Sequence, residues 1–245
     1  MKDIYKNIHL YFDEGPHKYT DSNGTTITNY GYIRYIWEYF RAKGVPAEGV
    51  AALMGNLYSE SLCVPYIMQG NTTYPFSDSW NYTQDVTDGT ISKYDFINNA
   101  PNGGGYGLPQ WTTKSRKTGY YEYFQLGGYS SIGDKKLGCD YIWHELNTGW
   151  STTLNKLKSN ASMRDKTVYV LKYYEGPEDQ STPVQTLRYN RAKCIYEYMN
   201  GTAYQDPEDD HSGEGGGSGG GGATPSNRKI TGITLRNPIF YQRRF

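Results

Sequence analysis

The chain of 245 residues has no apolar run long enough to cross a membrane, and its first residues lack the apolar core of a secretory signal peptide. Its three cysteines form no CxxC pair, and its four histidines show no metal-ligand spacing. Lysine plus arginine equals aspartate plus glutamate, at 25 each, so the net basic charge typical of nucleic-acid-binding proteins is missing. We therefore expect a protein that is made in a cytoplasm, uses no metal or cofactor, and binds neither nucleic acid nor membrane.

Tyrosine is the abundant residue, with 26 Tyr and 5 Trp against only 7 Phe. Tyrosine and tryptophan join a flat apolar face to a polar group. Such side chains suit sugar rings, which have apolar faces and polar rims, and they also suit protein interfaces. The composition leaves both kinds of partner open.

The N-terminal segment 1–28 is predicted to form a small β appendage. Its expected strands are Ile8–Phe12, His17–Thr20 and Thr25–Thr28, and Asn23-Gly24 is typical of the turn between the last two. The appendage precedes the predicted main domain, which spans residues 29–200.

The composition changes after that domain. Residues 201–222 are acidic and then glycine-rich, which predicts a flexible linker. Residues 223–245 are too few to fold alone and are interpreted as a docking tail.

Apolar residues at helical spacing predict a mainly α main domain. Ile33, Ile36, Trp37 and Phe40 predict a helix over 30–43. The other predicted helices span 47–62, 114–126, 134–147, 151–159 (helix or turn), 163–174 and 185–199, the last with Leu187, Ala192, Ile195 and Met199 in the core. The polar residues 63–105 are predicted to form a long irregular loop with room for a short hairpin, and loops of this length are often functional.

Glu60 is the leading candidate for a catalytic residue. It lies three residues after Leu57, at the edge of the apolar stripe of the helix predicted over 47–62. A carboxyl group at such an edge is partly removed from water, which disfavours its charged form and suits a general acid. A glutamate that simply leans into solvent at the helix end explains the same position.

The segment GGGYGLPQWT, Gly103–Thr112, is the second candidate element. Glycine-rich turns allow a backbone to approach a ligand closely. Gln110 offers a hydrogen-bond donor and acceptor, and Trp111 offers either a plane for stacking sugars or an anchor in the core. A purely structural turn is the simpler reading of this segment alone.

Three segments together resemble the phage tail lysozyme family, which is related to goose-type lysozymes and lytic transglycosylases. They are MGNLYSES (Met54–Ser61), GYGLPQWT (Gly105–Thr112), and YYEGPEDQ with RYNRAKCIYEY (within Tyr173–Tyr198). The resemblance covers about residues 30–200. Pro109 departs from the family pattern, because it removes a backbone N–H where that pattern often has a small residue.

The resemblance implies a lysozyme-like helical fold without a cofactor. It implies cleavage of bacterial peptidoglycan at the β-1,4 bond between N-acetylmuramic acid and N-acetylglucosamine, with Glu60 as general acid. The expected substrate-binding residues are Ser61, Tyr106, Gln110, Trp111 and Tyr174. The expected setting is a phage virion tail, or a host cytoplasm and then the cell wall, with residues 223–245 binding other tail proteins.

The second carboxylate is open at this stage. An inverting glycosidase needs a base about 6.5–9.5 Å from the acid, whereas the related transglycosylases use one glutamate. The candidates in the predicted loop are Asp78, Asp85, Asp88 and Asp95, each of which also suits a solvated turn. The sequence therefore does not choose between hydrolysis and transglycosylation.

Two functions of other classes compete with the enzyme. The chain could be a catalytically inactive, lysozyme-like tail component that binds cell wall or tail proteins, because a fold can outlast its chemistry. It could also be a cell-wall binding module that never cleaves its glycan.

Overall fold

The computed structural model describes residues 16–69 and 75–205. The expected strand Ile8–Phe12, most of the linker and the tail lie outside the described residues. The chain divides into two units, Met1–Tyr204 and Gln205–Phe245.

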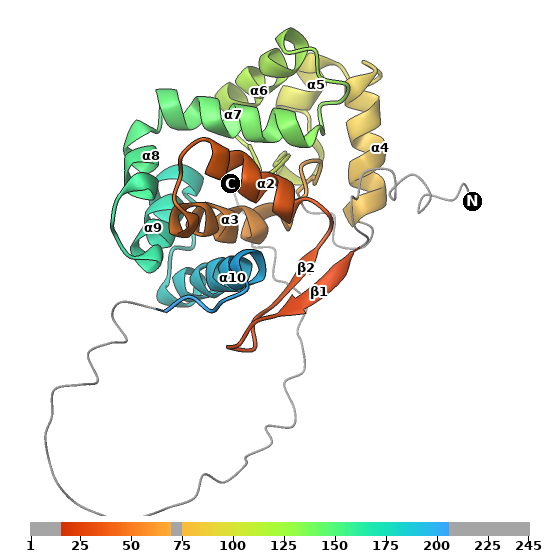
Figure 1. Cartoon of the computed structure of the whole chain (residues 1–245). Helices are drawn as coiled ribbons and strands as arrows, with labels where there is room; N and C mark the ends of the chain where they lie inside the picture. Colours follow the sequence, from red (N-terminus) through yellow and green to blue (C-terminus); the bar gives the residue numbers. More distant parts are fainter. Residues whose placement is uncertain (1–15, 70–74, 206–245) are drawn as a thin grey trace, which may run out of the picture. The chain divides into compact units, whose positions relative to one another are not determined.

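The described residues form a mainly helical domain with a small hairpin, as predicted (Figure 1). The helices are α2 (Ile33–Ala42), α3 (Ala47–Ser61), α4 (Pro75–Thr87), α5 (Lys93–Asn98), α6 (Lys114–Leu126), α7 (Lys135–Thr148), α8 (Ser151–Lys158), α9 (Met163–Val170) and α10 (Thr182–Asn200). A 3-10 turn, η1 (Pro101–Gly103), precedes α6, and a π-helical turn, η2 (Leu171–Glu175), continues α9.

The hairpin joins β1 (His17–Thr20) to β2 (Thr26–Asn29) as an antiparallel pair, with His17 opposite Asn29. The connection between the strands contains Gly24 at φ +80°, a left-handed conformation that glycine adopts without strain. Ser22 and Tyr19 both donate hydrogen bonds to Glu197, so the hairpin is fastened to α10.

Helix α3 is the centre of the fold. Every residue from Gly49 to Tyr58 is buried, and α2, α8, α9 and α10 pack against the helix (Figure 1). The apolar stripe that predicted this helix describes only one of its faces. Small residues, among them Gly49, Ala51, Ala52 and Gly55, let neighbouring helices approach its other faces.

The prediction of an irregular loop over 63–105 is wrong for two segments, Pro75–Thr87 and Lys93–Asn98. Helix α4 and helix α5 both form there, and Phe96 and Val86 are buried. The polar residues that suggested a loop occupy outer faces and caps: the Ser92 hydroxyl, for example, accepts a hydrogen bond from the Asp95 N–H at the start of α5.

The placement of Leu187 in the core is also wrong, since its side chain is 45% exposed. The buried face of α10 instead carries Val184, Arg188, Ala192 and Ile195. An arginine therefore occupies a core-facing position, where periodicity alone favours an apolar residue.

Gly55 sets the distance between α3 and α10. A β-carbon built at Gly55 would lie 2.6 Å from the carbonyl oxygen of Arg188 and 2.8 Å from the β-carbon of Ala192. Neither atom belongs to a flexible side-chain end, so α10 would have to move.

We predict that Gly55→Ala destabilises the protein by about 1–3 kcal/mol through overpacking. A glycine inside a helix normally gains about 0.5–1 kcal/mol on replacement by alanine, so a loss has the opposite sign. Chemical denaturation measures the change. The control is Gly149→Ala, because a β-carbon there meets no atom within 4 Å. A stabilised Gly55→Ala protein would contradict this close approach.

Candidate active site

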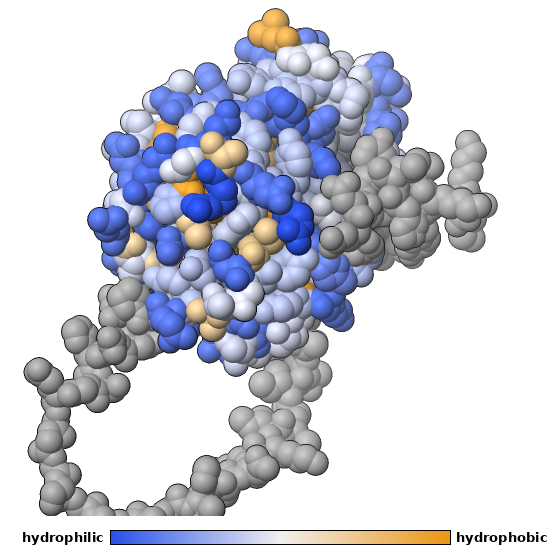
Figure 2. Space-filling view, viewed as in Figure 1, coloured by the Kyte–Doolittle hydropathy of each residue, from blue (hydrophilic) through white to orange (hydrophobic). Residues whose placement is uncertain are grey.

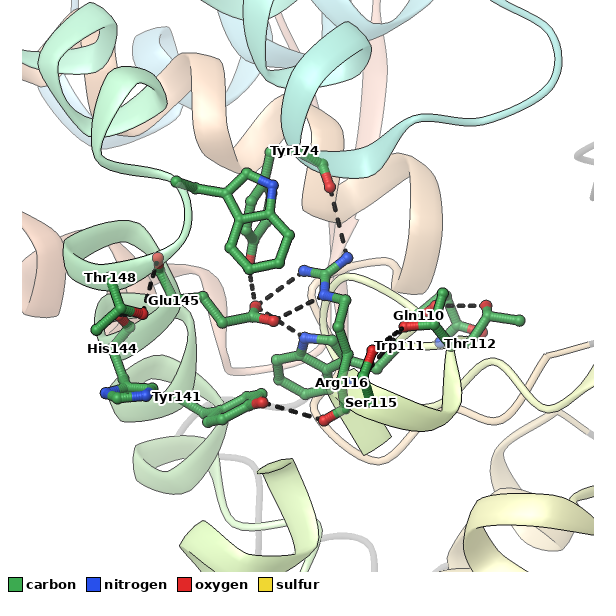
Figure 3. Close-up of polar contacts among 12 residues, drawn as sticks. Gln110, Trp111, Thr112, Ser115, Arg116, Tyr141, His144, Glu145, Thr148 and Tyr174 are labelled. Carbon is green, nitrogen blue, oxygen red and sulfur yellow. Dashed lines mark hydrogen bonds and ion pairs between the residues drawn. The ribbon is translucent and has the colours of Figure 1, made fainter. Parts of the chain in front are cut away.

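Glu145 on α7 is a buried carboxylate, 3% exposed, that joins several elements. Arg116 on α6 donates to both of its oxygens, from Nε at 2.7 Å and from Nη2 at 2.8 Å. The Trp111 indole donates to Glu145 at 3.0 Å and the Tyr174 hydroxyl at 2.7 Å (Figure 3). The carboxylate thus has four donors, which compensate for its burial.

Arg116 is held from its other side as well. Its guanidinium lies 4.9 Å from the Trp150 ring centroid and 4.8 Å from that of Tyr174, in cation–π contact. Burial, followed by the nearby Glu145, raises the pKa of Tyr174, so its hydroxyl remains protonated and continues to donate.

A tight turn carries the Gly-Leu-Pro-Gln-Trp segment. Tyr106 and Trp111 exchange backbone hydrogen bonds across it. Gly107 has φ +77°, and a β-carbon there would lie 2.7 Å from the Trp111 ring, so glycine is required. The Gln110 side chain donates to the carbonyls of Ile67 and Gly107, which closes the turn and ties it to the segment after α3.

Ser61 connects this turn to the end of α3. Its hydroxyl donates to the Leu108 carbonyl oxygen at 2.8 Å and lies 3.1 Å from the Leu57 carbonyl oxygen. The backbone after it turns sharply, because Leu62 and Cys63 both have positive φ values. The residue next to Ser61 in the chain is Glu60, so this bond fixes the backbone that carries the Glu60 side chain.

Glu60 lies at the core boundary, as predicted, with its side chain 18% exposed. Arg188 on α10 donates through Nη2 to Glu60 Oε1 and through Nη1 to the Asn56 side chain, one turn earlier on α3. This ion pair spans 128 positions of sequence and depends on the close approach at Gly55.

Glu175 is a second buried carboxyl group, and Glu60 lies within its electrostatic range. It ends η2, is 8% exposed, and has one oxygen without a hydrogen-bond partner. Burial first, and then the charge of Glu60, raises its pKa well above the usual glutamate range.

Four of the five residues expected to bind substrate are buried: Ser61, Tyr106, Trp111 and Tyr174. Their polar atoms bond to the protein; the Tyr106 hydroxyl, for example, lies 2.7 Å from the Thr83 hydroxyl. Trp111 is a core anchor that stacks on Tyr120 at 4.2 Å, and Gln110 is half-buried. The substrate-binding role of all five stays a prediction.

The four loop aspartates do not gather at Glu60 through any hydrogen bond or ion pair found among the described residues. Asp78 and Asp88 are exposed, and Asp85 and Asp95 are partly exposed. A hydrogen bond from Thr90 lowers the pKa of Asp88, and one from Ser92 lowers the pKa of Asp95. These two are therefore ionised turn and cap residues.

The sequence reading missed Arg116, Glu145, Glu175 and Arg188. A signal was present for two of them. Glu145 shares a helix face with Tyr141 and Ile142, and Arg188 is four residues from both Val184 and Ala192. A charged residue on an apolar stripe needs a partner, so each of these positions predicts a buried ion pair.

Other site classes find no support in the part of the chain that the structure describes. No three His, Cys, Asp or Glu side chains there come together as a metal-binding group, and the three cysteines are free and buried. Within residues 16–69 and 75–205, no helix combines the length and apolarity that a membrane span needs.

A helical domain whose buried central helix ends in a partly exposed glutamate, beside a Gly-Leu-Pro-Gln-Trp turn, is lysozyme-like in class. A family model described as phage tail lysozyme matches residues 32–199, and the chain belongs to that family. Membership indicates a lysozyme-like role at the bacterial cell wall. Among curated proteins, none matches the chain.

We predict that Glu145→Gln destabilises the protein by about 3–5 kcal/mol, because it leaves the buried Arg116 guanidinium without its partner. The control is Glu122→Gln. Glu122 pairs with Lys93 on the surface, with side chains 53% and 41% exposed, and exposed pairs contribute at most about 1 kcal/mol. Urea titration of both variants measures the difference, and equal effects would contradict a central role for Glu145.

Proposed function

We propose that the protein cleaves bacterial peptidoglycan at the β-1,4 bond between N-acetylmuramic acid and N-acetylglucosamine, with Glu60 as general acid. The observation that carries the proposal is the position of Glu60: a partly exposed carboxyl group at the end of the buried helix α3, in a chain of the phage tail lysozyme family. A carboxyl group that is partly withdrawn from water and rigidly held suits proton donation to a glycosidic oxygen.

Arg188 has a defined part in this chemistry. When Glu60 gives up its proton it becomes a carboxylate, and the guanidinium already in contact with it stabilises that charge. Asn56 orients Arg188, so the stabilising group needs little rearrangement during the reaction.

The five expected substrate-binding residues differ in their exposure, and this proposal gives the exposed and the buried ones different roles. Gln110 lies at the partly exposed edge of the turn. The other four are buried and support the site from the protein interior; they are Ser61, Tyr106, Trp111 and Tyr174.

We further propose that the protein works within a phage tail during entry or lysis. Its family supports this setting, and residues 223–245 are the segment proposed to bind other tail proteins. On the face seen in Figure 2, the described residues are mostly hydrophilic with small scattered hydrophobic spots, so this face offers no broad apolar surface for a partner.

The second candidate is a catalytically inactive tail component. The ion pair between Glu60 and Arg188 favours it, since a glutamate whose carboxyl group is bound by arginine has a structural role without any chemistry. The two functions differ in one measurable property, the appearance of new glycan ends.

We predict that the purified protein releases soluble fragments from peptidoglycan and that Glu60→Gln lowers the rate by about 10²–10⁴-fold, because a general acid contributes that much. Turbidity loss and mass spectrometry of the fragments measure the rate and identify the bond. The fragments also distinguish hydrolysis, which leaves a reducing end, from transglycosylation, which leaves an anhydro-sugar.

The matched control is Glu38→Gln, an exposed glutamate on α2 whose loss should leave the rate unchanged. Undiminished cleavage by Glu60→Gln would remove Glu60 from the mechanism. No cleavage by the unaltered protein would favour the inactive tail component.

A further inference from the structure

Two glutamine side chains lie against the glycine-rich start of the Gly-Leu-Pro-Gln-Trp turn. A β-carbon built on Gly105 would lie 2.6 Å from Gln69 Oε1 and 3.0 Å from Gln110 Oε1. Only glycine allows both side-chain amides to approach the backbone this closely. The two amides therefore flank the same residue of the turn.

Gln69 is held in place by its pairing with Gly105. Its backbone N–H donates to the Gly105 carbonyl oxygen at 2.8 Å, and its side-chain Oε1 accepts from the Gly105 N–H at 3.1 Å. The neighbouring residues Met68 and Tyr106 form an antiparallel bridge. Because a backbone N–H can only donate, the Gln69 atom that it contacts is the oxygen, and the atom left unused is the donor Nε2.

Gln110 is held in the opposite sense. Its Nε2 donates to the Ile67 carbonyl oxygen at 2.9 Å and to the Gly107 carbonyl oxygen at 2.8 Å, so the atom left unused is the acceptor Oε1. The residue has φ +51°, a left-handed conformation that costs free energy in a residue other than glycine. Strain of this kind is concentrated at functional sites.

The two unused atoms are complementary to one kind of ligand group. Among the described residues, neither Gln69 Nε2 nor Gln110 Oε1 has a hydrogen-bond partner, and neither is a fully buried polar atom. Both side chains are partly exposed. The turn thus presents one donor and one acceptor, each fixed by hydrogen bonds of its own amide. A secondary amide carries the matching pair, a carbonyl oxygen and an N–H.

We propose that Gln69 is a substrate-binding residue, which forms with Gln110 a site for a secondary amide group of peptidoglycan. Gln69 Nε2 donates to the carbonyl oxygen of the ligand, and Gln110 Oε1 accepts from its N–H. Peptidoglycan carries such amides in the acetamido groups of its sugars and in its stem peptides. The inference rests on the proposed function and deepens it by naming the chemical group that the turn recognises.

The amide site is connected to the end of α3. The Ser61 hydroxyl, next in the chain to Glu60, donates to the Leu108 carbonyl oxygen. Three residues of extended chain, the separation of Gly105 from Leu108, span at most about 10 Å. A polymeric glycan can therefore contact both places at once. Because both amides are fixed before the ligand arrives, binding costs little side-chain entropy.

The first test measures binding and needs no cleavage. Gln69→Glu keeps an oxygen for the Gly105 N–H but replaces the donor with an acceptor, which faces the ligand carbonyl oxygen unfavourably. Calorimetry with an uncharged tetramer of N-acetylglucosamine should show about tenfold weaker binding by this variant. The control is Gln125→Glu, the same change at an exposed glutamine on α6, which should bind as the unaltered protein does.

A second probe, the stem peptide without sugar, separates the two sources of the amide. Weaker binding of the tetramer by Gln69→Glu assigns the site to acetamido groups, and weaker binding of the peptide alone assigns it to the stem. Unchanged binding of both probes would overturn the inference, as would no binding of either by the unaltered protein. Nitrogen-15 NMR of the unaltered protein checks the same point without a variant, since the Gln69 side-chain amide signal should shift with the bound probe.

The second test separates binding from chemistry in the cleavage of soluble glycan strands. Gln69→Glu should raise KM by about tenfold and leave kcat unchanged, because the contact is equally strong before and during bond cleavage. A lower kcat at unchanged KM would indicate a merely structural role and overturn the inference. If the unaltered protein cleaves nothing, the proposed function fails, while the binding test still decides the role of Gln69.

Discussion

Buried charge must be paired or neutralised, and this constraint organises the centre of the protein. Glu145 accepts hydrogen bonds from Arg116, Trp111 and Tyr174. Because these residues come from different segments, the bonds fix α6, α7, η2 and the turn at 105–112 relative to one another. Trp111 and Tyr174, two of the side chains expected to bind a glycan, are therefore held in place by hydrogen bonds to the buried Glu145 carboxylate. Rigidity of this kind is what a site needs to hold reacting groups in place.

The close contact of α3 with α10 brings the second charged pair together. Only because Gly55 has no side chain does the backbone of Arg188 come near enough for its guanidinium to reach both Asn56 and Glu60. The fold thus places a cation on the proposed catalytic acid. In the proposed chemistry, that contact stabilises the carboxylate that Glu60 becomes after it has given up its proton.

Much of the fold was predictable because its signals are local. The stripe of Ile33, Ile36, Trp37 and Phe40 predicted α2, and the Asn23-Gly24 turn predicted the hairpin. The prediction failed where polar residues dominate, at α4 and α5, because these helices bury few side chains and their caps resemble loop sequence. It failed at Leu187 because Arg188, satisfied by Glu60, takes the core-facing position on α10.

The sequence by itself determined the helices, the family resemblance and the place of Glu60 at the edge of an apolar face, since each depends on residues close together in the chain. Tertiary structure alone decided that Trp111 is buried on Tyr120, that Arg188 meets Glu60, and that one buried oxygen of Glu175 receives no hydrogen bond. The physical reason is that charge pairing depends on which helices pack together and how closely. That packing follows from burial summed over the whole domain, with contacts as distant as 128 positions.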